Sequence, residues 1–215
     1  HGFGGWMLAL GRVTGLIGMI MYALNLVYST RWRFLEFFFG GLNRVYIAHH
    51  MLGGFALIFL SFHPLFLALR YIKTSLMQAA LLLLPNGLTP LGALFDTSNV
   101  LHQTILNQWA IFLGIVAFWG MIALLLVTFF IRIPYRWWLL THKWLGAVFF
   151  IGGLHVLLIK TETMDYNTIR YYTLGMTALG LYAFVYKTIA NRITIKKFKY
   201  RVVRSFVEAG NVYQI

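Results

Sequence analysis

Five apolar segments make up most of the chain, and each is close to the length of about 20 residues that a helix needs to cross a membrane. They cover residues 4–28, 44–70, 108–131, 137–160 and 168–190. Hydrophobic residues form 60% of the sequence and charged residues 11%, which leaves too little polar surface for a water-soluble protein of this size. We therefore expect an all-α integral membrane protein, a helical bundle of five spans with the lipid bilayer as its surroundings.

Charge is distributed as in a membrane protein, and we expect no binding of nucleic acid. The 18 Lys and Arg residues outnumber five Asp and Glu residues, but the bases lie mainly at the ends of the apolar segments. The positive-inside rule places the base-rich connections 29–44 and 132–138 in the cytoplasm, together with the tail from residue 187. The first residues and the segment 71–107 then lie outside. An odd number of spans with an outer N-terminus predicts a further span before residue 1, which gives six in the intact domain.

The outer segment contains one stretch that is too apolar for a free linker. Residues 75–95 read SLMQAALLLLPNGLTPLGALF. We expect this stretch to form an interfacial helix or a lid over the outer face. A poorly packed loop is the alternative.

Four histidines lie inside two spans that run in the same direction. His49 and His63 are separated by ~40° around an ideal helix and ~21 Å along it. His142 and His155 have a similar rise of ~20 Å but an angular offset of ~140°. A tightened turn between the latter two, or a frayed helix start at His142, is expected to absorb this offset. Because imidazole at membrane depth needs a partner, the pattern predicts two metal centres stacked across the membrane, each with two histidines.

The residues around these histidines favour haem over other metal sites. Imidazole binds zinc, copper and iron alike, but the chain has no cysteine, and Glu36 is the only acid near the inner histidines. Aromatic and glycine residues flank the histidines and suit a flat ligand between helices, although ordinary membrane packing is the alternative for each. We choose His49 as the ligand and expect His50 to flank the site or contact a propionate. His102 is expected to be solvated.

Two stretches resemble the ferric reductase transmembrane domain shared by bacterial ferric-reductase-like proteins and NADPH oxidases. They are GRVTGLIGMIMYALNLVYSTRWRFLEFFFGGLNRVYIAHHMLGGFALIFLSFHPLFLAL and FFIRIPYRWWLLTHKWLGAVFFIGGLHVLLI. The resemblance implies two b-type haems, an inner one held by His49 and His142 and an outer one held by His63 and His155. It further implies one-electron transfer from NADPH or NADH through cytosolic FAD to an acceptor outside the inner membrane of a bacterial cell.

The tail favours the same organisation. Residues 191–215 alternate apolar and polar side chains, as an opening strand or hairpin does, and resemble the start of a ferredoxin-reductase-type flavin-binding domain. We therefore assign 1–190 to the haem domain and 191–215 to the truncated start of a cytosolic flavin domain. No glycine-rich dinucleotide fingerprint follows. Binding of FAD and NAD(P)H is expected of a missing cytosolic dehydrogenase domain, the partner of this chain.

The electron acceptor remains open between oxygen, a ferric chelate and a periplasmic protein. Animal NADPH oxidases carry an additional histidine, implicated in oxygen reduction, where this chain has Leu67. Superoxide production therefore does not follow from the resemblance. The alternative function is a haem-bearing electron-transfer subunit that serves a periplasmic reductase such as a methionine sulfoxide reductase. A transporter with a histidine relay would need acidic partners or broken helices at mid-depth, and the spans lack those acids.

Four basic residues complete the predicted site. Arg44, Arg136 and Lys143 lie near the inner histidines, where they pair with haem propionates or a docked flavin domain; anchoring of the helices is the alternative. Arg12 lies ~12 Å below the outer edge of the membrane, level with His63. The GRVTG around it resembles the family position whose arginine lines the outer haem. We expect a catalytic role there toward the acceptor, with snorkelling to the lipid headgroups as the alternative.

Overall fold

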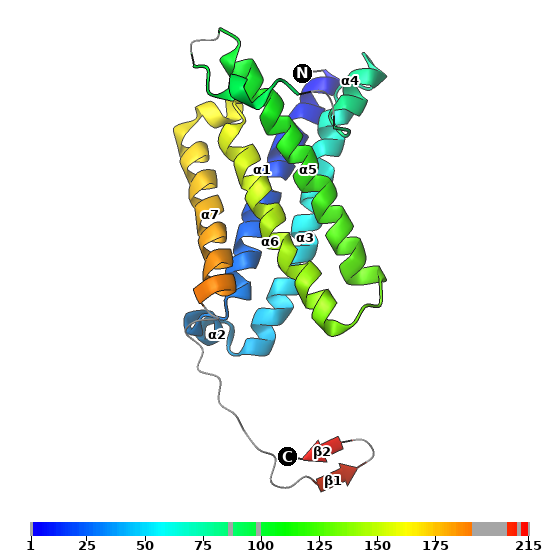
Figure 1. Ribbon diagram of the computed structural model, residues 1–215, viewed down its shortest axis with the longest axis vertical. Coiled ribbons are helices and arrows are strands. Elements are labelled where there is room, and N and C mark those ends of the chain that lie inside the picture. The colour runs from blue at the N-terminus through cyan, green and yellow to red at the C-terminus, as the bar shows by residue number, and fades with distance from the viewer. Residues whose placement is uncertain (1, 86–87, 98–99, 191–205, 210–211, 215) are drawn as a thin grey trace.

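Five long helices form an elongated bundle with shorter helices near its ends (Figure 1). The computed structural model describes residues 2–85, 88–97, 100–190, 206–209 and 212–214. Its helices are α1 (Phe3–Ser29), α2 (Arg33–Phe39), α3 (Leu42–Leu69), α4 (Leu76–Leu81), η1 (Leu91–Leu94), α5 (His102–Phe130), α6 (Tyr135–Leu158), η2 (Glu162–Asp165), α7 (Asn167–Val185) and η3 (Tyr186–Ala190), and its strands are β1 (Phe206–Ala209) and β2 (Val212–Gln214). The predicted helical bundle is confirmed.

Four of the long helices, α1, α3, α5 and α6, are long and apolar enough to cross a membrane. Each of the five predicted spans coincides with a helix, although α5 begins at His102 rather than at residue 108. The fifth helix, α7, has 19 residues and begins with the polar sequence NTIRYY. The helices are therefore where the sequence predicts them, and the number that crosses the membrane stays a prediction.

The long helices are arranged as two closely packed pairs. α1 lies along α3 and α5 lies along α6, while α7 packs mainly against α1 and less extensively against α6. α3 and α6 run in the same direction (Figure 1), as the charge pattern predicts. In the described part of the chain, these two parallel helices are not among the pairs with extensive backbone contact. The backbones of α3 and α6 therefore approach each other less closely than those within each pair.

Small residues allow α1 to approach α3. A Cβ atom on Gly11 would lie 2.7 Å from Leu67, and one on Gly18 would lie 2.7 Å from Leu60. Membrane helices associate largely by van der Waals packing, which small residues at the interface make possible. The glycines of α1 thus fix its distance from the helix that carries His49 and His63.

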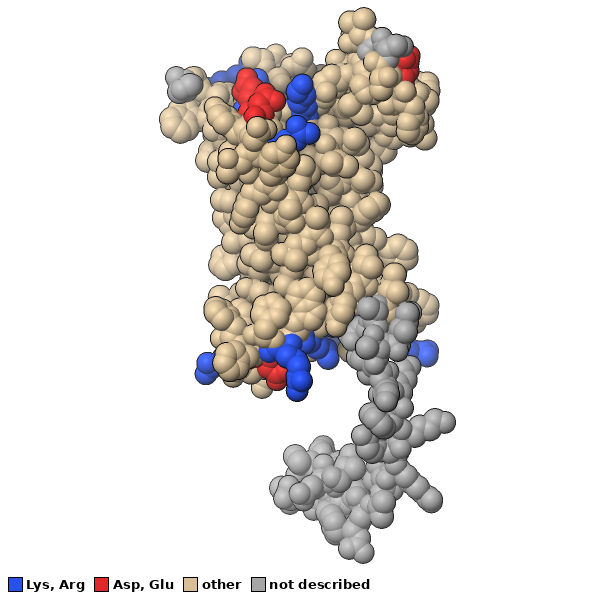
Figure 2. Space-filling view, turned by 90° about the vertical axis from the view of Figure 1, so that its left-hand side faces the viewer, with Lys and Arg blue, Asp and Glu red and all other residues tan. Residues whose placement is uncertain are grey.

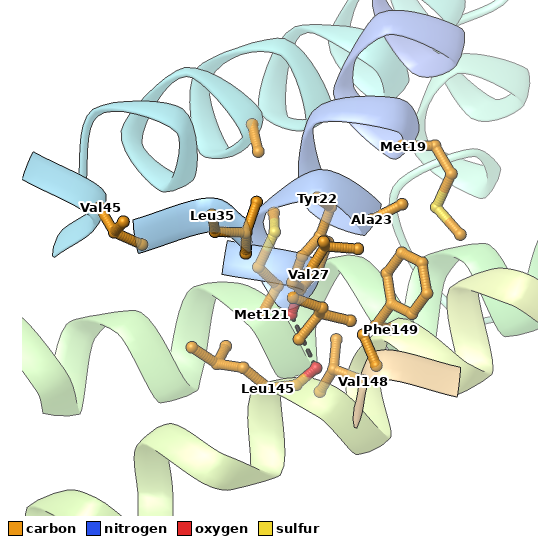
Figure 3. Packing of buried hydrophobic residues seen from close by; sticks show 13 residues of the cluster. Met19, Tyr22, Ala23, Val27, Leu35, Val45, Met121, Leu145, Val148 and Phe149 are labelled. Atoms are coloured by element: carbon orange, nitrogen blue, oxygen red, sulfur yellow. Dashed lines mark hydrogen bonds between the residues drawn. The ribbon is translucent and has the colours of Figure 1, made fainter. Parts of the chain in front are cut away.

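The hydrophobic core joins α1 to the second pair of helices. The phenol of Tyr22 is buried and donates a hydrogen bond of 2.7 Å to the carbonyl of Leu145 on α6 (Figure 3). The ring of Tyr22 also meets Phe149 edge-on, with centroids 5.0 Å apart. Because a buried hydroxyl without a partner is costly, this bond favours one alignment of α1 against α6.

Charged side chains gather at the two ends of the bundle, and the face drawn in Figure 2 has an uncharged belt between them. Bases predominate at the end that carries α2 and the α5–α6 turn: Arg31, Arg33, Arg44, Arg132, Arg136, Lys143 and Lys187, with Glu36 as the acid. The opposite end carries acids as well as bases. This is the asymmetry from which the orientation is predicted.

The segment between α3 and α5 contains a short helix and one side-chain contact with α5. Ser75 caps α4 by accepting a hydrogen bond from the backbone N–H of Gln78. The indole of Trp119 on α5 donates to the carbonyl of Leu83 at 2.8 Å. A short helix is therefore present, but α4 and η1 bury no residue, so the choice between an interfacial helix or lid and a poorly packed loop stays open.

The prediction that α6 is distorted near His142 is wrong. α6 is a regular α-helix over its whole length, so neither a tightened turn nor a frayed start lies at or after His142. The reason is that a histidine ring extends from the helix on two rotatable bonds. The angular position of its Cα atom alone does not determine where the ring lies.

The tail contains the predicted hairpin in part. β1 and β2 pair in antiparallel fashion, with Phe206 opposite Gln214 and Val207 opposite Tyr213. Residues 191–205, and with them the start of the predicted domain 191–215, lie outside the described residues. The assignment of this tail to a flavin domain stays a prediction.

Candidate metal centres

Two pairs of histidines face each other between α3 and α6. The ring centroids of His49 and His142 are 6.2 Å apart, with 70° between the ring planes. Those of His63 and His155 are also 6.2 Å apart, with 66° between the planes. With metal–nitrogen bonds of about 2 Å and nitrogens about 1 Å from each centroid, one metal ion bound between two imidazoles separates the centroids by about 6 Å. The spacing of both pairs suits a shared metal.

The outer pair is held by backbone carbonyls of the neighbouring helices. Nδ1 of His63 lies 2.7 Å from the carbonyl oxygen of Gly11 on α1, and Nδ1 of His155 lies 2.7 Å from that of Ala110 on α5. A carbonyl only accepts, so Nδ1 carries the proton in both rings. Nε2 then has a free lone pair, which is the arrangement that metal-binding histidines adopt.

A glycine makes room for each ring of the outer pair. A Cβ atom on Gly15 would lie 2.5 Å from Nδ1 of His63, and one on Gly114 would lie 2.9 Å from Nδ1 of His155. Each glycine follows the residue with the accepting carbonyl by four positions. α1 and α5 therefore each provide a carbonyl acceptor and, about one turn further on, a notch, which is the gap that the glycine leaves for the histidine ring. Sequence reasoning missed these residues. The small residues spaced by four, Gly11 with Gly15 and Ala110 with Gly114, were the available signal.

The inner pair is held less uniformly. His49 donates from Nδ1 to the carbonyl of Asn25 on α1 at 3.1 Å. Nδ1 of His142 is buried and has no hydrogen-bond partner among the described residues. His50 turns to its own helix and donates to the carbonyl of Tyr46 at 2.8 Å. Of the two adjacent histidines, His49 is thus the one that is fixed on α1 and lies opposite His142.

A cavity of about 350 Å³ adjoins the outer pair. His63 and His155 both line it, together with mostly apolar side chains of α1, α3, α5 and α6 such as Phe118 and Phe149. Arg12 and Arg70 are among its lining residues and bring positive charge to it. A flat apolar ligand with anionic groups at one edge matches this lining, and sequence reasoning missed Arg70.

The donor set offers two histidines at each candidate site. Among the described residues, no three or more His, Cys, Asp or Glu side chains form a group that could hold a metal. Structural and catalytic zinc sites take three or four protein ligands. A haem brings porphyrin nitrogens of its own to the iron, so two histidines at each site would be enough to hold it. The residues present therefore fit haem.

Arg12 lies beside the outer histidine pair, and its catalytic role stays a prediction. It lines the same cavity as His63, and Nη1 forms an ion pair of 3.0 Å with Glu162 in η2. Its side chain is 25% exposed, and its Nε atom is buried without a hydrogen-bond partner in the described structure. Its guanidinium thus partly faces the cavity, where an anionic ligand could satisfy it.

The other three basic residues lie on the elements that carry the inner histidines. Arg44 is in the first turns of α3, and Arg136 and Lys143 are on α6. All three side chains are exposed. Their roles toward a propionate or a flavin domain stay predictions. His102, expected to be solvated, instead has a buried Nδ1 atom, so that expectation is wrong for this part of the ring.

Comparison with known proteins identifies the family. A search among curated proteins found no match. A family model described as "Ferric reductase like transmembrane component" matches residues 14–153, which include His49, His63 and His142 and end two residues before His155. The match covers more than half of the chain, so the resemblance found in the sequence is confirmed. The chain belongs to the ferric reductase-like transmembrane components, and it is a multi-pass membrane protein of an oxidoreductase family associated with electron transfer in the membrane.

Proposed function

We propose that this chain transfers electrons across a membrane through two b-type haems, one between His49 and His142 and one between His63 and His155. The observation that carries the proposal is the pairing itself. Two histidine pairs at different depths have the same centroid distance of 6.2 Å, which suits a metal bound by two imidazoles. When bound, each haem supplies an iron centre that takes up and releases one electron.

The protein side chains would prepare these sites for their ligand. The hydrogen bonds from Nδ1 of His49, His63 and His155 leave Nε2 of each ring unprotonated and aimed away from the carbonyl. The apolar lining of the outer cavity excludes water from a porphyrin ring. Arg12 and Arg70 supply positive charge for haem propionates or for an anionic acceptor.

The charge distribution supports a direction for the transfer. The base-rich end, which carries α2 and the α5–α6 turn, is the cytoplasmic end by the positive-inside rule. Electrons would enter there from a cytosolic domain that binds FAD and NAD(P)H. They would leave beside His63 and His155. The positive charge of the cavity there would attract an anionic ferric chelate, and it would stabilise the superoxide anion that forms when oxygen accepts the electron.

An absorption spectrum and a haem assay test the proposal. We expect two haems per purified chain and a b-type α-band on reduction. His63→Ala should remove about one haem and leave the other, and His49→Ala should do the same at the other site. A parent protein without haem, or a His63→Ala variant that keeps both haems, would refute the assignment.

A further inference from the structure

His142 is restrained by a different kind of contact from the other three histidines. Its Nδ1 atom has no hydrogen-bond partner among the described residues. Instead, the indole of Trp138 lies flat against the imidazole, with centroids 5.1 Å apart and 7° between the ring planes. Offset stacking of this kind is a favoured arrangement of aromatic rings.

Trp138 is itself fixed by two further contacts. Its Nε1–H donates to the carbonyl of Thr128 on α5 at 3.2 Å. Tyr135 stacks on the same indole, with centroids 5.9 Å apart and 17° between the planes. Tyr135, Trp138 and His142 are spaced by three and four residues, so they follow one face of α6. The indole therefore has little freedom to move away from His142.

We propose that Trp138 is the positioning residue of His142. The stacked indole restricts rotation of the imidazole and keeps Nε2 directed at the inner metal. Backbone carbonyls have this task at His49, His63 and His155. The inference rests on the proposed function, because it takes His142 to be a ligand of the inner haem.

Two substitutions distinguish the contribution of the Trp138 ring from that of its N–H group. Trp138→Phe keeps an aromatic ring beside His142 and loses the hydrogen bond to Thr128, whereas Trp138→Leu loses both. Trp144→Leu is the matched control, because Trp144 is on the same helix but is 56% exposed on the surface. If Trp138→Leu does not accumulate in the membrane, Trp138→Met replaces it with the same expected outcomes.

The experiment measures haem coordination in the purified full chain. A haem with two histidine ligands binds carbon monoxide poorly, whereas loss of one ligand opens a position for it. We expect carbon monoxide to bind up to one of two haems in Trp138→Leu and the low-spin electron paramagnetic resonance signal of one haem to weaken. Loss of an orienting partner typically lowers metal affinity about 10–100-fold, so inner haem should also be lost on dilution. Trp138→Phe and Trp144→Leu should resemble the parent.

The possible results discriminate between a positioning role of Trp138 and a purely structural one. Adding Trp138→Leu to His142→Ala should change nothing further, because both act on one ligand. If Trp138→Leu retains two haems that exclude carbon monoxide, the inference is wrong. It is equally wrong if Trp138→Phe and Trp138→Leu are impaired alike, because Trp138 then serves to anchor the α5–α6 turn. Loss of both haems together would also contradict it. A parent protein without any haem would instead refute the proposed function.

Discussion

The notch at Gly15 allows a quantitative prediction for Gly15→Ala. The new Cβ atom would lie 2.5 Å from Nδ1 of His63, whereas ordinary contacts begin at 3.4 Å. Relief of this contact needs a shift of about 0.9 Å, and a shift of that size along the 2.7 Å bond to the Gly11 carbonyl would lengthen it to about 3.6 Å, beyond the limit of a hydrogen bond. Losing this orienting bond should weaken outer-haem binding about 10–100-fold, or about 1.4–2.8 kcal/mol.

A graded series of variants tests this reasoning. Gly114→Ala should have a smaller effect, because its Cβ atom would lie 2.9 Å from His155 and a shift of about 0.5 Å relieves the contact. Gly54→Ala is the control, since a Cβ there meets nothing within 4 Å and Ala favours a helix by about 1 kcal/mol. Haem per chain is measured after serial dilution in detergent. If Gly15→Ala retains its haem as well as Gly54→Ala does, the notch does not position His63.

Three further changes test the charged residues. Arg12→Ala should retain both haems but slow reoxidation by an anionic ferric chelate about tenfold, measured by stopped-flow absorbance. A parental rate with every acceptor would show that Arg12 serves only as an anchor. Glu162→Gln should change the free energy of unfolding by less than about 1 kcal/mol in a thermal melt, because its carboxylate is 84% exposed, while reoxidation by the same chelate becomes faster. Neutralising Arg44, Arg136 and Lys143 together should leave the haem content unchanged and slow reduction by the flavin domain; an unchanged rate would support simple anchoring.

The sequence was sufficient for the features that depend on one helix at a time. Apolar length predicts where each long helix lies, and the charged connections predict that α3 and α6 run in parallel. Together these place His49 and His142 at one depth and His63 and His155 at another. Spacing along a helix is reliable because the rise per residue is nearly constant.

Features that depend on how two helices meet were not predictable from spacing. The acceptors of the Nδ1 protons are backbone carbonyls of Gly11, Asn25 and Ala110, and every residue type has a carbonyl. Whether a glycine is a notch for a ring or an open position, as at Gly15 and Gly54, depends on the rotation of its helix. The four-residue spacing of Trp138 and His142 was visible, but it does not distinguish a stacked pair from two separate side chains.

The contacts that orient the four histidines follow the division of the bundle into two pairs of helices. On α3, His49 and His63 are both oriented by carbonyls of α1, the helix packed along α3. On α6, His155 is oriented by a carbonyl of α5, and His142 by an indole that is itself bonded to α5.

In the described part of the chain, the contacts that orient each ring thus come from within its own pair of helices. Such rings are preorganised before a ligand enters between the pairs, which lowers the entropy lost on binding. Under the proposed function, α1 and α5, which contribute no predicted ligand, should therefore also influence haem affinity through the contacts that orient the rings.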